Sequence, residues 1–280
     1  MTTKPTYAEL VEARKSRLAN HRTIVTPEME ARNAIKVEQL RQMTVKESNS
    51  YFWIDLSQKK FTHIFSAHHP HLKHPTINVS HPDNMSQTNL RAHPDTLYFN
   101  LESDIMFYDL MMAQPFEQRK NFVSVVLRCL KNEKNRYKVW LFTTYVDECD
   151  VVGVPCSLIV KAECLDMFST ENFQPYRQFY LANETNPHKI LLLDSDNKHI
   201  LKGKELKVLE LGEHGLTIEE TAAEMCVDVT TIKSHRTQTM LKLNAPTFPL
   251  ACMMAKKLKC LMNYKLCLIN YLLLIINYDL

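Results

Sequence analysis

The last third of the sequence contains the feature that most restricts how the chain can fold, a close succession of residues that end and start helices. Gly215 follows an apolar-periodic segment, and glycine is the residue type best able to adopt a left-handed helix terminus. Thr217, with Glu220 three residues later, has the capping-box pattern that starts the next helix. Asp228 is a suitable N-cap for a third segment, residues 229–243. The pattern predicts three helices joined by short turns.

The outer two of these helices have apolar residues at spacings of three and four, which indicates one buried face each. Those residues are Val208, Leu209 and Leu211 in the first helix, and Ile232, Met240 and Leu243 in the third. The opposite face of the third helix carries Lys233, Ser234, Arg236 and Thr237. A helix that enters a major groove with its N-terminus first would present such side chains to base edges and phosphates.

These residues resemble the LuxR family, whose helix-turn-helix pattern reads "LTxRExEVLxLLAxG", "LSNKEIAexLxIS" and "xTVKxHRxNIxxKL". The matching positions are Leu201, Glu205, Val208, Leu209, Leu211, Gly215, Leu216, Glu220, Ala222, Thr231, Lys233, His235, Arg236, Lys242 and Leu243. The resemblance implies an all-α, four-helix DNA-binding domain at residues 200–262, and hence a transcriptional regulator. It places Lys233, Ser234 and Thr237 at base-reading positions, and His235, Arg236 and Lys242 at backbone or packing positions. The expected DNA-binding residues are Thr230, Thr231, Lys233, Ser234, His235, Arg236, Thr237 and Lys242.

Charge placement agrees with this interpretation. Residues 201–228 contain three basic and seven acidic side chains, whereas residues 229–261 contain six basic and no acidic ones. A basic segment that coincides with the third helix is what phosphate neutralisation requires. The overall formal charge of +3 is too small to indicate a nucleic-acid partner by itself.

Three positions depart from the family pattern. Gly212 and Thr221 replace apolar residues, and Gln238 stands where Asn is common. The departures at Gly212 and Thr221, together with the apolar C-terminal tail, motivate an alternative function, a sensor or protein-interaction module whose helix-turn-helix serves dimerisation rather than DNA binding. Pro246 is expected to open a fourth helix, in which Leu250, Met253, Met254 and Leu258 form either a dimerisation stripe or a core stripe.

The N-terminal part of the chain predicts two amphipathic helices and then a sheet. The helices are separated near Thr26-Pro27, and we expect them to dock on the following domain rather than to pair with a second copy. Residues 51–56 and 61–65 are aromatic and β-branched runs around a polar tetrad, which indicates a hairpin. The stretch 67–96 reads as loop with short helical turns.

Further helices are expected at residues 105–112 and 116–130, the second with Pro115 at its start. Strands follow at residues 137–146 and 153–162, joined by an acidic turn at 147–150, and a short hairpin at 189–193 and 198–201. This order, a hairpin, helices and then antiparallel strands, predicts an α+β domain with helices on one side of one sheet.

The α+β part resembles a PAS domain. The similarity is most specific at His93-Pro94-Asp95, which is similar to the "HPDD" turn of many PAS sequences, and at residues 136–140, which are similar to the strand after their long helix. The resemblance covers about residues 49–165. It implies a sensor whose signal is a small-molecule ligand or a partner protein. Trp53, Phe65 and Trp140 are candidates to line its pocket, although core packing is the more common role for aromatic residues.

Other function classes find little support in the residues. Only four glycines are present, which leaves no Gly-rich nucleotide cradle, and neither GxSxG nor HExxH occurs. Seven histidines between His63 and His93 stand in a Pro-rich stretch without metal-ligand spacing, so we expect a surface loop and no metal. There is no phospho-acceptor cluster of a receiver domain. We therefore expect neither an enzyme nor a cofactor.

The eight cysteines form no CxxC pair, and no secretory leader is evident, so reduced thiols in the cytoplasm are expected. Residues 266–276 are almost wholly apolar but too short to span a bilayer. Three roles remain open for this segment: a helix on a dimer face, a membrane-surface anchor, or an extension with little function.

The sequence thus predicts a cytoplasmic, homodimeric regulator that binds double-stranded DNA, with no membrane span. Its expected parts are a helical extension at 1–48, a PAS-like sensor at 49–165, a connector at 166–199, a LuxR-type domain at 200–262 and an apolar tail at 263–280.

Overall fold

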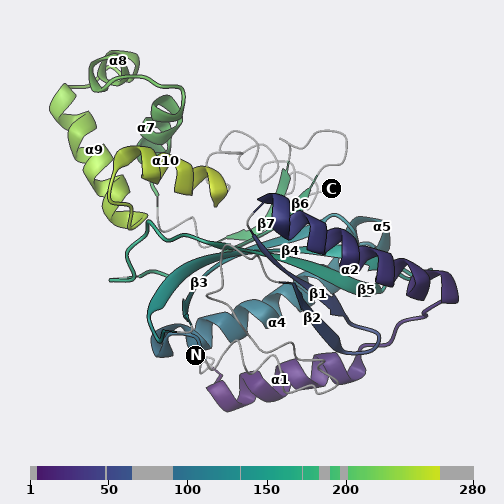
Figure 1. Ribbon diagram of the computed structural model, residues 1–280. Coiled ribbons are helices and arrows are strands. Elements are labelled where there is room, and N and C mark those ends of the chain that lie inside the picture. Colours follow the sequence, from purple (N-terminus) through teal and green to yellow (C-terminus); the bar gives the residue numbers. More distant parts are fainter. Residues whose placement is uncertain are drawn as a thin grey trace, which may run out of the picture. The chain divides into compact units, whose positions relative to one another are not determined.

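The computed structural model describes residues 5–47, 49–64, 91–132, 134–171, 173–182, 190–195 and 201–258. The chain divides into two compact units, residues 1–166 and residues 167–280 (Figure 1). Each unit has its own core and is described by itself.

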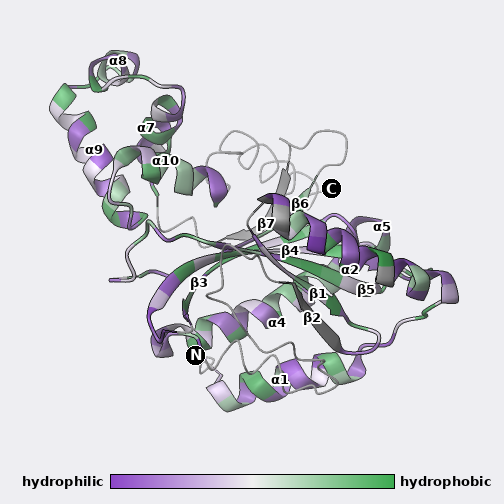
Figure 2. Ribbon diagram, in the orientation of Figure 1, coloured by the Kyte–Doolittle hydropathy of each residue, from purple (hydrophilic) through white to green (hydrophobic). Residues whose placement is uncertain are grey.

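The first unit is built around an antiparallel five-stranded sheet in the order β2-β1-β5-β4-β3. Its strands are β1 (Ser50–Asp55), β2 (Lys60–Ile64), β3 (Phe122–Lys131), β4 (Tyr137–Cys149) and β5 (Pro155–Cys164). The expected α+β domain with an antiparallel sheet is confirmed, and so is the hairpin formed by β1 and β2. Hydrophobic residues dominate the central strands, whereas the helix α2 (Pro27–Glu47) is mostly hydrophilic (Figure 2).

Helices cover both faces of this sheet, so the prediction of helices on one side only is wrong. Tyr51 and Trp53 of β1 pack on Leu40 of α2, whereas Phe52, between them, points to the other face and approaches Phe142 at 6.1 Å. That second face belongs to α4 (Leu97–Ala113), since Arg128 stacks over Phe142 and pairs with Asp104 of α4. The layers are therefore α2, the sheet and then α4, with α1 (Tyr7–Asn20) packed on α4 (Figure 1).

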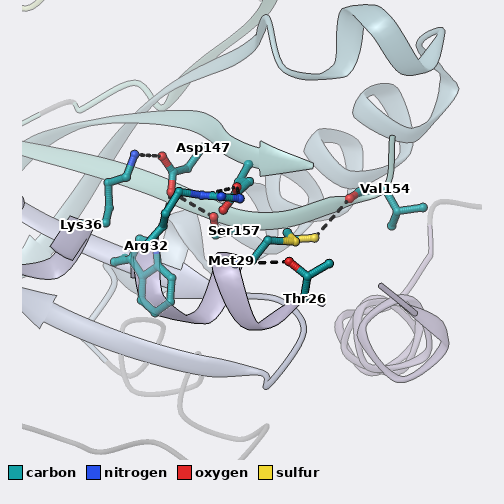
Figure 3. A network of polar contacts seen from close by, with 10 residues as sticks. Thr26, Met29, Arg32, Lys36, Asp147, Val154 and Ser157 are labelled. Atoms are coloured by element: carbon teal, nitrogen blue, oxygen red, sulfur yellow. Dashed lines mark hydrogen bonds and ion pairs between the residues drawn. The ribbon is translucent and has the colours of Figure 1, made fainter. Parts of the chain in front are cut away.

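The helix α2 is held by a polar cluster centred on the buried carboxylate of Asp147 (Figure 3). Lys36 of α2 forms an ion pair with it at 2.7 Å, and Ser157 Oγ donates to it at 3.0 Å. The indole N–H of Trp53 lies 3.4 Å from the same carboxylate. One turn earlier on α2, Arg32 pairs with Glu148. A buried carboxylate with three partners fixes the position of α2 along the sheet.

The helix α1 docks on α4 through apolar and ionic contacts. Leu10 packs on Leu101 and Ile105. Nε and Nη2 of Arg17 each donate to one oxygen of the Asp109 carboxylate at 2.6 Å. The expectation that the two N-terminal helices dock on the following domain is confirmed. The predicted break at Thr26-Pro27 also agrees with the observed start of α2 at Pro27.

The prediction of a helix at residues 116–130 is wrong. Only Phe116–Arg119 is helical (α5), and the chain continues as strand β3 from Phe122. Helical spacing was present, but the intervening residues Val123, Leu127 and Leu130 are also apolar, and β3 is buried on both faces. A continuously apolar run rich in β-branched residues fits a strand buried on both faces better than a helix with one polar face.

Other boundaries also differ from the expectations. The helix predicted at 105–112 is the C-terminal half of α4, whose first turns contain the buried polar residues Asn100 and Ser103 and so lack an apolar stripe. The acidic turn predicted at 147–150 is displaced, because β4 continues to Cys149 and the turn begins at Asp150. The His93-Pro94-Asp95 segment starts a short 3-10 helix at Pro94–Thr96.

The second unit contains a β-hairpin followed by helices. The strand β7 (Ile190–Ser195) pairs with β6 (Tyr176–Ala182) rather than with residues 198–201, which were predicted as its partner. Of that predicted partner strand, residues 198–200 lie outside the described part. So do Phe65, five of the seven clustered histidines and the apolar tail.

The indoles predicted to line a pocket lie in the interior of the first unit. Trp53 packs beneath α2, and Trp140 of β4 is fully buried. Core packing therefore accounts for both rings, as expected for aromatic residues.

The buried ring of His21 links three segments of the first unit. Its Nε2 lies 2.7 Å from the carbonyl of Pro155, which can only accept, so Nε2 donates. Nδ1 then accepts from the Tyr108 hydroxyl at 3.0 Å. Burial lowers the pKa of His21, which outweighs the favourable bond to the Pro155 carbonyl.

A lowered histidine pKa means that the unfolded chain binds this proton more tightly than the folded chain. The contribution of His21 to the free energy of unfolding is then complete above about pH 6.5, the pKa of histidine in the unfolded chain. It declines as the pH falls below that value. We predict a lower urea midpoint at pH 5.5 than at pH 7.5, and a smaller difference between the two midpoints in His21→Gln. An equal difference in both proteins would contradict the role given to His21.

Candidate nucleic-acid interface

The helical part of the second unit consists, within residues 201–258, of α7 (Gly203–Glu213), α8 (Ile218–Glu224), α9 (Val229–Lys242) and α10 (Phe248–Lys257). The turns joining the first three are short, as predicted. Gly215 has φ +83°, the left-handed conformation expected after α7. No helix among the described residues is long and apolar enough to cross a membrane.

The caps that start α8 and α9 differ in completeness. Thr217 Oγ1 accepts from the Glu220 N–H at 3.2 Å, and Glu220 Oε2 accepts from the Thr217 N–H at 2.8 Å, so the predicted capping box is formed. Asp228 has the extended backbone of an N-cap, but its side chain makes no capping hydrogen bond. The first turn of α9 therefore has no side-chain cap, and helix N-termini of this kind attract phosphate.

The core of this helical domain joins α7, α8 and α9. Val208, Ala222 and Ile232 form its buried centre, with Phe248 of α10 packed against it. The predicted apolar face of α7 is buried, and so are Ile232 of α9 and Leu243, the residue after α9, whereas Met240 of the predicted stripe is partly buried. This packing orients α9 so that the side opposite Ile232 is the exposed one.

Gly212, one of the departures from the family pattern, is explained by the ring of Phe248. A Cβ added at Gly212 would lie 2.4 Å from Phe248 Cε1, so the absent side chain makes room for the ring. On the ring, Arg236 stacks at 4.2 Å and donates to the Leu216 carbonyl at 3.0 Å. Thr221, the second departure, is fully buried and donates to the Thr217 carbonyl at 2.6 Å. Neither departure leaves a gap or an unpaired hydroxyl.

The exposed side of α9 is a continuous stripe of mainly polar side chains, which we call the α9 stripe. Its members recur at spacings of three and four and are Thr230, Lys233, Ser234, Thr237, Gln238 and Leu241. Leu241 is 68% exposed, which is unusual for a leucine on a small packed domain. Both hydrophilic and hydrophobic residues occur along α9 (Figure 2).

The predicted DNA-binding residues divide into two groups. Thr230, Lys233, Ser234 and Thr237 are exposed on the stripe, whereas Thr231, His235, Arg236 and Lys242 are partly buried. Sequence reasoning did not select Gln238 or Leu241 as site residues, although their spacing from Ser234 and Thr237 places them on the same side of the helix.

Two of the predicted basic contacts are engaged inside the protein. Arg236 stacks on Phe248, and Lys242 bonds both oxygens of the buried Glu205 carboxylate at 2.8 and 2.9 Å. Lys233 forms no ion pair within the described part of the chain. The positive charge that α9 presents to solvent is therefore smaller than the count of basic residues indicates.

The Glu205–Lys242 pair joins the start of α7 to the end of α9. Burial raises the pKa of Glu205, but hydrogen bonds from Lys242 and from the Lys202 N–H outweigh that effect, so the pKa lies below its ordinary value. Glu205 is thus held as a carboxylate that needs its lysine partner.

The fourth helix begins later than predicted. Thr247 caps it, and Pro249 rather than Pro246 lies in its first turn. Of the stripe predicted on this helix, Met254 and Leu258 are buried within the unit, which supports a core role for them, whereas Leu250 and Met253 are partly exposed.

Comparison with known protein families identifies this domain. Residues 199–255 match the family model described as "Bacterial regulatory proteins, luxR family". The second unit therefore contains a LuxR-family helix-turn-helix domain, as the resemblance predicted.

Solved structures that match this chain include three complexes of proteins named VqmA. "VqmA bound to DPO" is 14% identical, with 78% of this chain and 86% of that chain covered and a TM-score of 0.30. The phage VqmA–DPO complex is 12% identical, with 80% and 89% covered and a TM-score of 0.31. The Vibrio cholera VqmA–ligand–DNA complex is 12% identical, with 78% and 85% covered and a TM-score of 0.30. A comparison with curated protein sequences gave no match.

We predict that Gly212→Ala destabilises the protein, because the new methyl group meets the Phe248 ring. Overpacking of this kind costs about 1–3 kcal/mol. Combining it with Phe248→Leu, which removes the ring, should recover part of the loss relative to the two single variants. Additive effects in a denaturation cycle would show that the two residues do not interact.

We also predict opposite outcomes for two lysines of α9. Lys242→Met leaves the buried Glu205 carboxylate unpaired and should lower the free energy of unfolding by about 2 kcal/mol, less than for a fully buried pair because Lys242 is partly exposed. Lys233→Met, on the exposed stripe, should change stability by less than about 0.5 kcal/mol. Equal losses in urea denaturation would refute this assignment.

Proposed function

We propose that this protein is a sequence-specific DNA-binding transcriptional regulator whose LuxR-family domain places α9 in the major groove. The observation that carries the proposal is the α9 stripe, an exposed row of polar side chains on the helix that this family uses for DNA binding. The role is regulatory rather than catalytic.

The side chains of the stripe suit direct reading of bases. Lysine donates to the O6 and N7 acceptors of guanine, glutamine forms a two-bond contact with adenine, and serine or threonine hydroxyls bond either kind of base. We assign these roles to Lys233, Gln238, Ser234 and Thr237, and we assign phosphate binding to Thr230, Thr231 and the uncapped first turn of α9. Arg236, His235 and Lys242 support the position of the helix.

We further propose that the regulator acts as a homodimer in the cytoplasm, where bacterial DNA is accessible. Helix-turn-helix dimers bind two related half-sites about one helical turn apart, so the operator should contain an inverted repeat. The domain limits follow the sequence prediction, with a sensor at 49–165, its helical extension at 1–48, a connector at 166–199 and the DNA-binding domain at 200–262. The sensor is PAS-like and responds to a small molecule or a partner protein.

The alternative function, a dimerisation module without DNA affinity, rested on Gly212, Thr221 and the apolar tail, which lies outside the described residues. Both positions are accommodated by packing and hydrogen bonding in the helical domain. We therefore favour DNA binding.

The test starts with selection of bound sequences from a random DNA pool by the full-length protein. Lys233→Ala should then weaken binding to the selected sequence about tenfold, as expected for loss of one base contact, measured by fluorescence anisotropy. The slope of log affinity against log salt should change little, because Lys233 is assigned to a base and not to a phosphate.

Lys207→Ala is the matched control, since Lys207 is an exposed α7 lysine that pairs with Glu210. It should leave affinity for the selected sequence within about twofold of the parent. Failure to select any sequence would instead favour the dimerisation module.

A further inference from the structure

The turn that joins β3 to β4 in the first unit, residues 131–138, carries a run of basic side chains, and we call it the β3–β4 turn. It contains one acidic residue, Glu133, and four basic ones, Lys131, Lys134, Arg136 and Lys138. Lys134 and Arg136 are exposed and form no ion pair with the part of the chain that the structure describes. Two exposed cations without internal counter-charges attract an anionic partner.

The buried side chain of Asn132 holds the backbone of this turn. Its Oδ1 accepts from the N–H groups of Lys134 and Arg136, both at 2.9 Å. The Asn132 N–H donates to the Arg136 carbonyl at 2.8 Å. Asn135 has φ +56°, a left-handed conformation that asparagine adopts more readily than most other residues. Lys134 and Arg136 therefore extend from a preorganised backbone, which lowers the entropy lost when they bind a partner.

The other two basic residues of the turn are engaged within the first unit. Lys138 forms an ion pair with Asp166 at 3.0 Å, and Lys131 Nζ lies 5.2 Å from the centre of the Tyr137 ring. The same ring approaches that of His93 at 4.6 Å. Because two neighbours already contact Tyr137, its ring is poorly placed to stack on an unpaired base. The turn is therefore unsuited to single-stranded nucleic acid, which binds largely by such stacking.

The turn also lacks the apolar contact area of a protein interface. No described residue between 131 and 138 is a large exposed hydrophobic one, whereas stable protein interfaces centre on aromatic or aliphatic anchors. Lysine and arginine are the side chains that most often bond the phosphates of duplex DNA, and those contacts carry no sequence information. Two preorganised cations without an aromatic or aliphatic anchor thus fit a phosphate backbone best.

We propose that the β3–β4 turn binds the phosphate backbone of double-stranded DNA flanking the sequence that α9 reads, with Lys134 and Arg136 as its two contacts. The inference rests on the proposed function, because duplex DNA is the partner that α9 binds there. The contact adds affinity without adding sequence specificity. It also makes the DNA site longer than the inverted repeat.

The first experiment compares two duplexes bound by the full-length protein. One is the selected sequence alone, and the other is the same sequence extended by about one helical turn of unselected DNA at each end. Lys134→Ala combined with Arg136→Ala should weaken binding to the extended duplex but change affinity for the short one by less than about twofold, because the short duplex lacks the flanking phosphates.

The salt dependence on the extended duplex identifies the kind of contact. Each lost phosphate contact lowers the slope of log affinity against log salt by about 0.9, so the double alanine variant should lose about two for each bound protomer. The advantage of the parent protein over this variant should therefore shrink about tenfold per protomer between about 50 and 200 mM salt.

The matched control removes the same charge from elsewhere in the first unit. Lys15→Ala with Arg41→Ala deletes two exposed cations that pair within α1 and α2, and it should keep the affinity and salt slope of the parent on both duplexes. Lys134→Arg with Arg136→Lys, which retains both charges, should also bind as the parent does. Each double variant should shift the thermal midpoint by less than about 2 °C, because all of these side chains lie on the surface. Equal losses in the two alanine variants would overturn the assignment to the β3–β4 turn.

The second experiment is hydroxyl-radical footprinting of the extended duplex. The parent protein should protect sugars outside the inverted repeat, and Lys134→Ala with Arg136→Ala should lose that protection while still protecting the repeat. Identical footprints, or an unchanged salt slope, would overturn the proposal. The proposed function would survive that result, provided that Lys233→Ala still loses affinity for the selected sequence.

Discussion

The ring of Phe248 lies in the space left by Gly212 of α7 and supports the guanidinium of Arg236 of α9. It also packs against the core formed by Val208, Ala222 and Ile232. A single aromatic side chain thus joins α10 to the helices before it and holds Arg236 on the inner side of α9. The exposed α9 stripe, and with it the proposed DNA contact, depends on this packing because it determines which side of α9 faces solvent.

A comparable constraint organises the first unit. The buried carboxylate of Asp147 receives Lys36, Ser157 and Trp53, and so holds α2 against one face of the sheet. On the other face, Asp104 of α4 receives Arg128 and Arg14. The two N-terminal helices are therefore structural parts of this unit.

Local signals in the sequence predicted much of the fold and part of the site. Gly215, Thr217 and Glu220 act through bonds within a few residues, so their roles could be read directly. The strand β3 was mistaken for a helix because a run apolar on every side carries no periodicity that distinguishes the two. The engagement of Arg236 and Lys242 inside the domain was also not predictable in detail, because it depends on Phe248 and Glu205, which are distant in sequence.

Recovery of DNA bound by the full-length protein across a bacterial genome, compared with Lys233→Ala, tests the central claim most directly. The account predicts one shared motif with two inverted half-sites among the recovered fragments, and a large loss of those fragments in the variant. Fragments without a common motif, or the same motif recovered equally well by Lys233→Ala, would contradict the claim that the α9 stripe reads DNA.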